Sequence, residues 1–301
     1  MYKRVNIRRM RGDNVTHTVC LILLSLCTLV FIYPVIYIIS VSFSSADAVQ
    51  KREIWLLPVR FSLSAYRLCF EHDYLFGSFG NAFLYSISGT VYSMLLTVFG
   101  AYALAHKQLR GRGIFTMLIF FTMLFSGGLI PTYLLVKDLK MVNTFWAMVI
   151  PCAVSQWNLI VMRTVFQENP ESLEESAKID GASHLTILFR IIIPISKPVI
   201  ATIALLYFVG KWNDYFTALV YLNEKEKFPL QLIARELLVS FSDRLLNRNA
   251  SAAADPNAAL SYTPESFRAA VIVICVAPMM AIYPFLQRYF VKGIIVGAVK
   301  G

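Results

Sequence analysis

The chain has 301 residues, of which 57% are hydrophobic and 15% carry a charge, and its net charge is +10. An ordinary soluble domain carries about 25% charged residues, so this composition excludes one and predicts a membrane protein. The basic excess does not indicate nucleic-acid binding, because its distribution fits a membrane topology. The five cysteines form no disulfide framework, and no residues have the spacing of metal ligands.

Six membrane spans are expected along the chain. Four runs free of Asp, Glu, Lys and Arg exceed the roughly 20 residues that a helix needs to cross the hydrocarbon core of a bilayer. The fifth apolar stretch holds two charged residues and the sixth holds two prolines. The expected spans cover about 18–42, 81–106, 114–136, 143–165, 197–222 and 269–289. This pattern predicts an all-α membrane protein with six transmembrane helices.

The distribution of basic residues predicts the orientation. Basic residues outnumber acids before the first span, and the second connection and the tail hold basic residues but no acid. Because cytoplasmic loops are enriched in lysine and arginine, both termini are expected in the cytoplasm. The first apolar run is longer than the core of a cleavable signal, so it is interpreted as a retained first helix.

Two polar or aromatic segments are expected on the outer side. Residues 43–80 are rich in aromatic side chains, which suits either a packed extracellular cap or an amphipathic lip on the bilayer surface. Residues 223–267 are polar, and the small residues from Asn249 to Asn257 indicate an exposed, mobile loop. Within the third span, Ser126-Gly127-Gly128 and Pro131 predict a broken or kinked helix.

A polar, glycine-broken segment lies between the fourth and fifth spans. Asn169 is a suitable N-cap and Pro170 suits the first helical position of a short helix with acidic first turns. Gly181 provides a stop, Ser183 caps a second helix, and Pro194 ends it. The two helices form a bent knuckle on the cytoplasmic face. From these local features alone, an ordinary amphipathic loop helix at the membrane surface is the more common interpretation.

The fifth span holds Lys211 and Asp214, the only charged residues well inside a span. A charge there costs roughly 2.5–3.5 kcal/mol on insertion scales, so it is expected to face a cavity or a partner. At a spacing of three, the two side chains can pair on one helix face. The neighbouring Trp212, Asn213 and Tyr215 offer the aromatic faces and amide group that a sugar site uses. A translocation pathway, a structural ion pair and a contact to another subunit are all compatible with this pattern.

The stretch from Glu175 to Ser183, followed by Ile191 to Pro194, resembles the signature by which permease subunits of ATP-driven importers dock onto their ATPase partners. Together with the fifth-span stretch Lys211 to Phe216 and the tail from Gln287 to Gly301, it makes the chain similar to carbohydrate-uptake permeases of the maltose type. Within that class the chain looks closest to the branch that serves polysaccharide-derived oligosaccharides. Ser176 replaces the alanine of the general motif.

The resemblance implies a function and a set of partners. The chain would be the transmembrane permease subunit of an ATP-binding-cassette importer that moves sugars, and oligosaccharides in particular, across the bacterial cytoplasmic (inner) membrane. It would not be an enzyme and would bind no cofactor, since ATP and Mg would be bound by the partner ATPase. The implied partners are a second, homologous permease subunit, two ATPase subunits, an extracytoplasmic sugar-binding protein and membrane lipid, but no nucleic acid.

The resemblance also implies roles for individual residues. The ATPase-coupling residues would be Glu175, Ser176, Ala177, Asp180, Gly181 and Pro194. The pathway or substrate residues would be Lys211, Trp212, Asn213, Asp214 and Tyr215. The contacts to the binding protein would be Asn249, Asp255 and Asn257.

The expected organisation places a basic cytoplasmic N-terminus at 1–17, a six-span permease domain at 18–290 and a cytoplasmic tail at 291–301. The permease domain would contain a cytoplasmic coupling segment at 169–198, between the fourth and fifth spans, and an outer loop at 223–267.

Two other classes of protein compete with the importer. An ion-coupled secondary transporter needs intramembrane carboxylates, and this chain offers only Asp214 at depth, while the coupling segment would be unexplained. A membrane-embedded enzyme needs a nucleophile with its base or a metal cluster, whereas the four histidines all lie at or beyond the edges of the spans. The chain also lacks the glycine-rich phosphate loop of ATP-binding proteins.

Overall fold

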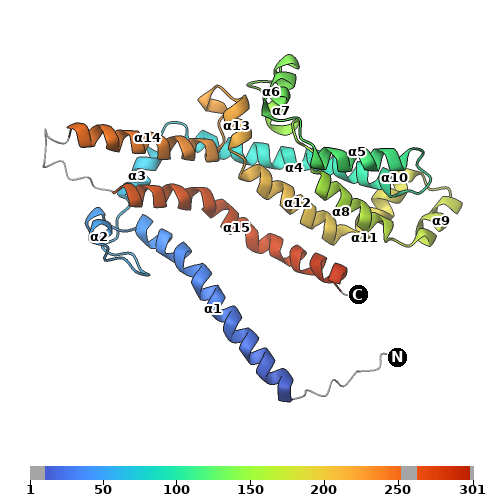
Figure 1. The fold of residues 1–301 in the computed structure, drawn as a ribbon, viewed down its shortest axis with the longest axis horizontal. Coiled ribbons are helices and arrows are strands. Elements are labelled where there is room, and N and C mark those ends of the chain that lie inside the picture. The colour runs from blue at the N-terminus through green and yellow to red at the C-terminus, as the bar shows by residue number, and fades with distance from the viewer. Residues whose placement is uncertain (1–10, 252–262, 299–301) are drawn as a thin grey trace. The chain divides into compact units, whose positions relative to one another are not determined.

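The structure is a computed structural model that describes residues 11–251 and 263–298. Within these residues the chain forms helices and turns but no β-strand, apart from an isolated bridge between Ser44 and Phe61 (Figure 1). The predicted all-α class is confirmed. The chain divides into two compact units, the first made of Met1–Glu71 and Leu237–Ile274 and the second of His72–Glu236 and Cys275–Gly301.

The first unit contains α1 (Arg11–Ser42), α2 (Ala46–Gln50) and α3 (Ser64–Phe70). The second unit begins with α4 (Leu75–Ala105), α5 (Arg112–Leu124), α6 (Leu129–Asp138), α7 (Phe145–Val149) and α8 (Gln156–Gln167). It continues with α9 (Glu171–Ile179), α10 (His184–Ile187), the π-helix η1 (Leu188–Ile192), α11 (Ile193–Ile195), α12 (Lys197–Trp212), α13 (Phe216–Tyr221) and the 3-10 helix η2 (Lys225–Lys227). Two long helices, α14 (Leu230–Ser251) and α15 (Pro264–Ala298), contribute residues to both units.

The core of the second unit lies where α4, α8 and α12 pack alongside one another (Figure 1). A buried hydrogen bond of 2.7 Å joins Thr97 Oγ1 of α4 to Tyr207 OH of α12, and the same hydroxyl accepts from the backbone N–H of Ser155 at 3.0 Å. These bonds satisfy polar groups that would be costly to bury alone. The apolar cluster around them consists of Val98, Ala101, Tyr102, Leu104, Leu159, Met162, Phe166, Ile187, Leu188, Ile192, Ile203 and Tyr207.

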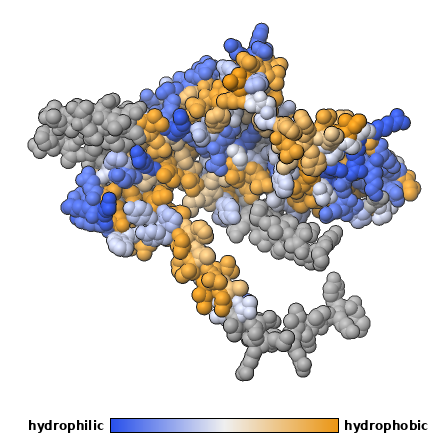
Figure 2. All heavy atoms as spheres, in the orientation of Figure 1, coloured by the Kyte–Doolittle hydropathy of each residue, from blue (hydrophilic) through white to orange (hydrophobic). Residues whose placement is uncertain are grey.

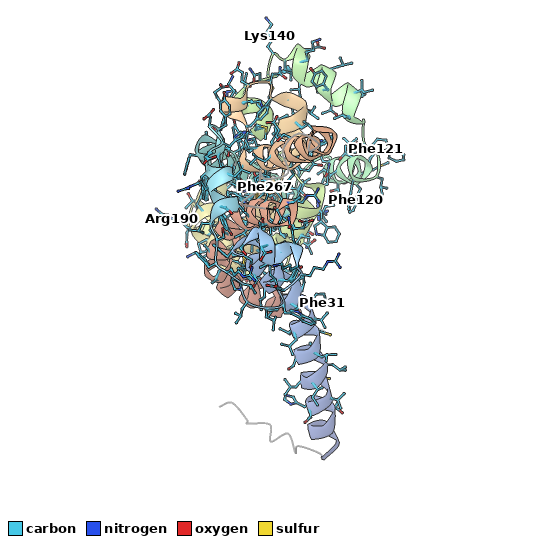
Figure 3. The ribbon with its side chains drawn as sticks, turned by 90° about the vertical axis from the view of Figure 1, so that its left-hand side faces the viewer. Phe31, Phe120, Phe121, Lys140, Arg190 and Phe267 are labelled. Atoms are coloured by element: carbon cyan, nitrogen blue, oxygen red, sulfur yellow. The ribbon has the colours of Figure 1, made fainter. Side chains whose placement is uncertain are left out.

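Three helices in the described part of the chain are long and apolar enough to cross a membrane, at Thr16–Ser42, Leu75–Ala105 and Pro264–Pro284. The apolar surface of α1 is visible as orange in Figure 2. Figure 3 shows Phe31 projecting from α1, and Phe120 and Phe121 projecting from α5. These side chains are exposed, as expected for surfaces that meet lipid rather than water.

The expected third span is broken, as its glycines predicted. Helices α5 and α6 meet at an angle of 116°, and the break contains Gly128, whose φ is +84°. A second bend of 86° separates the α10–α11 stretch from α12. If each bent pair counts as one span, the described residues offer up to five candidate spans. The count of six therefore stays a prediction.

The expected fourth span, 143–165, is divided rather than continuous. Helix α7 ends at Val149 and α8 begins at Gln156. The connection contains Pro151, which has no backbone N–H to donate, and Cys152, whose φ is +53°. Both features interrupt the helical hydrogen-bond pattern in a stretch that is uncharged and apolar in sequence.

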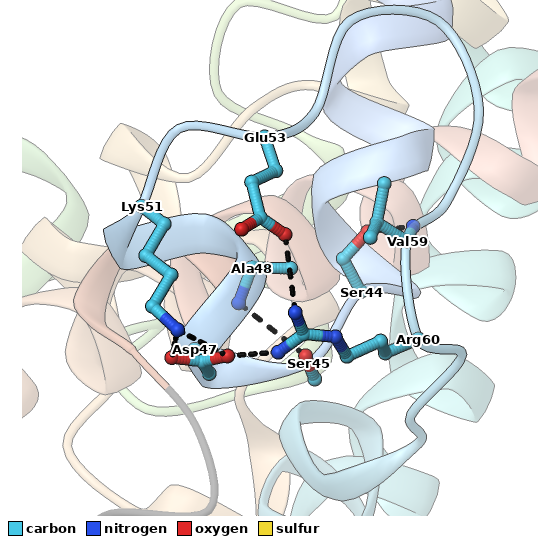
Figure 4. A network of polar contacts seen from close by, with 8 residues as sticks. All are labelled: Ser44, Ser45, Asp47, Ala48, Lys51, Glu53, Val59 and Arg60. Atoms are coloured by element: carbon cyan, nitrogen blue, oxygen red, sulfur yellow. Dashed lines mark hydrogen bonds and ion pairs between the residues drawn. The ribbon is translucent and has the colours of Figure 1, made fainter.

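The segment between α1 and α3 is a folded cap held by polar contacts (Figure 4). Asp47 lies 2.8 Å from Lys51 Nζ and also contacts Arg60, which reaches Glu53 at 3.4 Å. Ser45 caps α2 by accepting from the N–H of Ala48. Beneath these exposed pairs lies a small apolar core of Val41, Ala48, Ile54 and Ala269.

Candidate functional site

The first short helix of the expected coupling segment is α9, and a glycine ends it. Gly181 has φ +81°, a conformation that residues with a Cβ adopt at a cost. Its N–H donates to the carbonyl of Lys178 at 3.0 Å, and the N–H of Ala182 donates to the carbonyl of Ala177 at 2.9 Å. This pair of bonds is a Schellman motif, which satisfies carbonyls at the end of a helix. The stop predicted at Gly181 is confirmed.

The start of α9 differs slightly from the prediction. Pro170 occupies the cap position and Glu171 begins the helix, so Asn169 is not the N-cap. The Asn169 amide instead donates to Ser196 Oγ at 3.5 Å. This contact links a residue two positions before α9 to the residue before α12 and draws the two ends of the segment together.

The second helix begins as predicted but does not stop at Pro194. The side chain of Ser183 accepts from the N–H of Thr186 at 3.3 Å, which confirms the cap. Helical backbone then continues through η1 and α11 to Ile195, and Ser196 separates it from α12. Pro194 stands near the start of α11, directly after the π-helix η1, where the hydrogen-bond pattern departs from that of an α-helix.

The coupling segment is amphipathic in three dimensions. Ile187, Leu188 and Ile192 are buried in the cluster formed with α4, α8 and α12, and Ala177 and Ala182 pack against it. The other face is open: Glu175, Ser176, Asp180 and Gly181 are exposed, and Ile179 is 86% exposed. Blue surface gathers over the α9 end of the molecule in Figure 2. Of the predicted coupling residues, Pro194 is also exposed, whereas Ala177 is partly buried.

A histidine at the end of α4 contacts α9. His106 Nδ1 lies 3.4 Å from Glu174 Oε2, and the two side chains retain only 21% and 18% exposure. The His106 ring meets Tyr102 edge-on at 4.5 Å, and the Tyr102 hydroxyl donates to the His184 carbonyl at 3.2 Å. Tyr102 and His106 therefore tie α4 to both helices of the coupling segment.

Burial sets the protonation preference of this histidine. It lowers the pKa of His106 below its ordinary value of 6.5, while the charge of Glu174 acts in the opposite direction. Lys178 and His184 lower it further because they would repel an imidazolium. His106 Nδ1 faces the carboxylate, and Nε2 is buried without a hydrogen-bond partner among the described residues.

A groove of about 400 Å³ runs beside this pair. It combines carboxylates and cations from α9 with basic residues that follow α4, which gives it mixed charge. Its polar lining includes His106, Lys107, Arg112, Glu174, Glu175 and Lys178.

The predicted pathway residues lie at a break between α12 and α13. Trp212 is buried, with its ring centroid 4.9 Å from that of Phe83, so it packs inside the unit and does not face an opening. Asn213 and Tyr215 are exposed, and the Arg235 guanidinium lies 5.9 Å from the centre of the Tyr215 ring. The break thus presents an amide and an aromatic ring beside a cation.

The two charged residues of the fifth span do not form the ion pair that was one of the three compatible interpretations. Among the described residues, no ion pair joins Lys211 to Asp214. Asp214 Oδ1 instead accepts from the backbone N–H of Thr217 at 3.0 Å, in the first turn of α13. The helix breaks one residue after Lys211, so a capping bond is available to Asp214 that a continuous helix would not offer.

Of the three predicted contacts to a binding protein, Asn249 is the one that lies within the described residues. Asn249 lies in the helical backbone of α14 rather than in a loop, because residues 230–251 contain no glycine or proline to end the helix. Asp255 and Asn257 lie outside the described residues.

Sequence reasoning missed His106 as part of the coupling region. Its place at the edge of a span was noted, but its partner Glu174 is remote in sequence. The sequence feature that could have indicated this contact is a histidine directly after a span, together with Glu174 as a second acid in the first turns of α9.

Three comparisons place the chain among known proteins. Residues 6–296 match the family described as the binding-protein-dependent transport system inner membrane component. Protein LplC of Bacillus subtilis (strain 168) is 42% identical over 270 residues, which cover 90% of each protein. The polygalacturonan/rhamnogalacturonan transport system permease protein YtcP of the same organism is 40% identical over 274 residues, which cover 91% of this chain and 94% of YtcP.

A solved structure is also similar. It is a bacterial ABC transporter involved in the import of the acidic polysaccharide alginate, and one of its chains matches with a TM-score of 0.81 and 36% identity. The match covers 93% of this chain and 98% of that one. The resemblance found in the residues is therefore confirmed over nearly the full length, and the chain belongs to the family of inner membrane components of binding-protein-dependent transport systems, as a transport subunit and not an enzyme.

Proposed function

We propose that this chain is one of two permease subunits of an ATP-binding-cassette importer that carries oligosaccharides across the cytoplasmic membrane. The observation that carries the proposal is the coupling segment, in a chain whose family membership spans residues 6–296. Its exposed acidic face follows α9 to the Gly181 turn, while its other face is buried against α4, α8 and α12. A surface anchored in this way transmits a conformational change of a soluble partner to the membrane helices.

Polysaccharide-derived oligosaccharides are the proposed cargo. The relatives include a polygalacturonan/rhamnogalacturonan permease and an arabinooligosaccharides permease, AraQ of Halalkalibacterium halodurans, which is 27% identical over 275 residues. An ion-coupled secondary transporter is not favoured, because this family works with a binding protein and Asp214 is the only carboxylate within the fifth span.

The coupling segment is the proposed docking site for the ATPase. Glu175 meets a basic group on the ATPase in a charge-assisted contact, and Gly181 supplies the bend that lets the two surfaces approach. Ser176, Ala177 and Asp180 complete the contact, and Pro194 shapes the second helix. ATP and Mg bind to the partner ATPase subunits and not to this chain.

The break between α12 and α13 is the proposed pathway region. Lys211, Asn213, Asp214 and Tyr215 line or support it, and Trp212 holds the end of α12 in place. The segment around Asn249, Asp255 and Asn257 meets the extracytoplasmic binding protein. In this arrangement the chain crosses the membrane six times within 18–290, and its two termini, 1–17 and 291–301, are cytoplasmic.

The test uses the complete complex of this chain, its second permease, the ATPase and the binding protein in liposomes. Stimulation of ATP hydrolysis by sugar-loaded binding protein is measured for wild type and for Glu175→Lys. We expect the stimulation to be lost in Glu175→Lys. The control is Glu168→Lys, which reverses an exposed charge just before α9 and should keep the stimulation. Equal stimulation in Glu175→Lys and wild type, with the ATPase still associated, would overturn the docking role.

A further inference from the structure

Lys211 is a cation in the last turn of α12 that forms no direct ion pair within the described chain, and Asp214 is the one acid close enough among the described residues to interact with it electrostatically. Its side chain is partly buried, and its aliphatic stem runs over Gly89 of α4, where an added Cβ would lie 3.3 Å from Lys211 Cδ. The glycine thus leaves just enough room for the stem and fixes its course. A lysine within a membrane helix costs roughly 2.5–3.5 kcal/mol on insertion scales, so it is expected to have a compensating partner.

The nearest acid is already engaged. Asp214 Oδ1 accepts the Thr217 N–H at 3.0 Å, where a carboxylate also favours the positive end of α13. On the other side of the break, the Arg235 guanidinium lies over the exposed ring of Tyr215. The charged groups of this region are therefore two cations and one carboxylate that caps a helix.

The face of α4 that carries Gly89 also holds two buried hydroxyls. Ser86 and Ser93 lie three residues before and four residues after Gly89, so all three share one face of α4. Both serine side chains are buried, and their hydroxyls have no hydrogen-bond partner among the described residues. A neutral sugar would be bound by hydroxyl and amide groups alone and would leave the lysine uncompensated.

We propose that the Lys211 ammonium binds a carboxylate of the sugar in transit, and hence that the cargo is an acidic oligosaccharide containing uronic acid residues. The inference rests on the proposed function and specifies its substrate class. An ammonium and a carboxylate form a charge-assisted hydrogen bond, stronger than the neutral bonds that sugar hydroxyls make. Asn213 and Tyr215 follow this cation in sequence and are exposed, so the second N–H and the oxygen of the Asn213 amide, which donates once to the Val209 carbonyl at 2.9 Å, suit sugar hydroxyls, and the Tyr215 ring suits the apolar face of the same sugar.

The first test measures ATP-dependent uptake by the complete complex in liposomes. The probes are an oligogalacturonide and the same oligomer with its carboxyl groups methyl-esterified. For Lys211→Gln we expect uptake of the acidic oligomer to fall about tenfold or more, because a hydrogen bond to a charged group is lost. Lys211→Arg, which keeps the charge, should restore most of it. The matched control is Lys137→Gln, which removes an exposed lysine from the last turn of α6.

A second test is independent of what the binding protein accepts. In the assembled complex, acylation of the Lys211 amine is followed by peptide mass spectrometry in the presence of galacturonate or of galactose. We expect galacturonate to slow the acylation and galactose to leave it unchanged at the same concentration and ionic strength. Equal rates with both sugars would overturn the proposal.

The outcomes separate this inference from the function on which it rests. If Lys211→Gln lowers uptake of both oligomers equally, the lysine is structural or pairs with an acid of the second permease, and the inference is wrong. Import of only the esterified oligomer would also overturn it while leaving the importer intact. If the wild-type complex hydrolyses no additional ATP with any loaded binding protein, the proposed function itself fails.

Discussion

The coupling segment and the cap between α1 and α3 are both polar segments, but they are held in different ways. The coupling segment is fixed by fully buried aliphatic side chains, Ile187, Leu188 and Ile192, and its charged residues are largely free for contact. The cap uses its charged residues on itself, in exposed pairs around Asp47 and Arg60. Buried apolar contacts contribute far more than exposed ion pairs. The comparison teaches that the coupling segment is anchored firmly while its recognition face stays available.

The largest expected effect comes from removing an anchor of the coupling segment. Leu188→Ala deletes a fully buried side chain, which costs about 2–5 kcal/mol in a closely packed core. We expect faster amide hydrogen exchange across 171–195 and a lower thermal midpoint in detergent. Leu185→Ala, three residues earlier and 59% exposed, deletes the same atoms at the surface and should change neither measurement appreciably. Equal effects in the two variants would contradict the anchoring role.

A smaller effect is expected from the bend. Gly181→Ala meets no neighbouring atom within 4 Å, so its cost is conformational and amounts to about 1–2 kcal/mol at this positive φ. We expect the end of α9 to fray and ATPase stimulation to fall, while the core cluster keeps its exchange protection. The control is Gly77→Ala in α4, where the added Cβ also meets open space and φ is not positive. This variant should keep the ATPase stimulation of the wild type. Unchanged stimulation in Gly181→Ala would show that the bend is not needed for coupling.

Acidification tests the one polar anchor of the coupling segment. Because burial lowers the pKa of His106, the unfolded chain binds the proton more readily than the folded chain. The stabilising contribution of the neutral His106 side chain is therefore fully present above the ordinary histidine pKa of 6.5, and it is lost as the pH falls below that value. We expect amide exchange in α9 to accelerate as the pH falls below 6.5, apart from the intrinsic pH dependence of exchange. This effect should be smaller than that of Gly181→Ala.

The histidine variants make that expectation specific. His106→Gln should flatten the pH dependence of protection in α9, whereas His72→Gln, a histidine outside the coupling region, should leave the slope unchanged. Glu174→Gln should make the loss of protection on acidification larger and extend it to lower pH, because the carboxylate is the group that raises the pKa of His106 in the folded chain. A pH dependence that persists fully in His106→Gln would assign it to another group.

Local sequence features predicted the parts of the fold that depend on local interactions. Gly181 and Ser183 act through bonds within a few residues, and the glycines near Pro131 break the third span for the same reason. The continuation past Pro194 was not predictable from the proline alone, because burial of Ile187, Leu188 and Ile192 determines the course of that helix. An apolar, uncharged run indicates a span but not its continuity, and the break after α7 follows from Pro151 and the positive φ of Cys152.

For the candidate site, the motif located residues whose exposure the structure describes, but it did not indicate their tertiary contacts. The motif located Glu175, Asp180 and Gly181, and the structure gives them an exposed face. An ion pair of Lys211 with Asp214 was one of the open interpretations, and it is not formed because the helix ends between the two residues. The contact of His106 with Glu174 joins segments remote in sequence, so only the tertiary fold could reveal it.

The smallest expected effect completes the comparison at the cap. The Lys51 and Arg60 contacts hold the pKa of Asp47 below its ordinary value of 3.8, so their contribution is present above that pH and is lost as the pH falls through the lowered value. Asp47 is exposed, and water and salt screen such pairs at neutral pH. We expect Asp47→Asn to leave the thermal midpoint at pH 7 within the reproducibility of the measurement, as for Asp73→Asn. A clear drop in Asp47→Asn alone, abolished by about 0.5 M salt, would show that the exposed network holds the cap more firmly than its small apolar core, and would remove the contrast with the coupling segment.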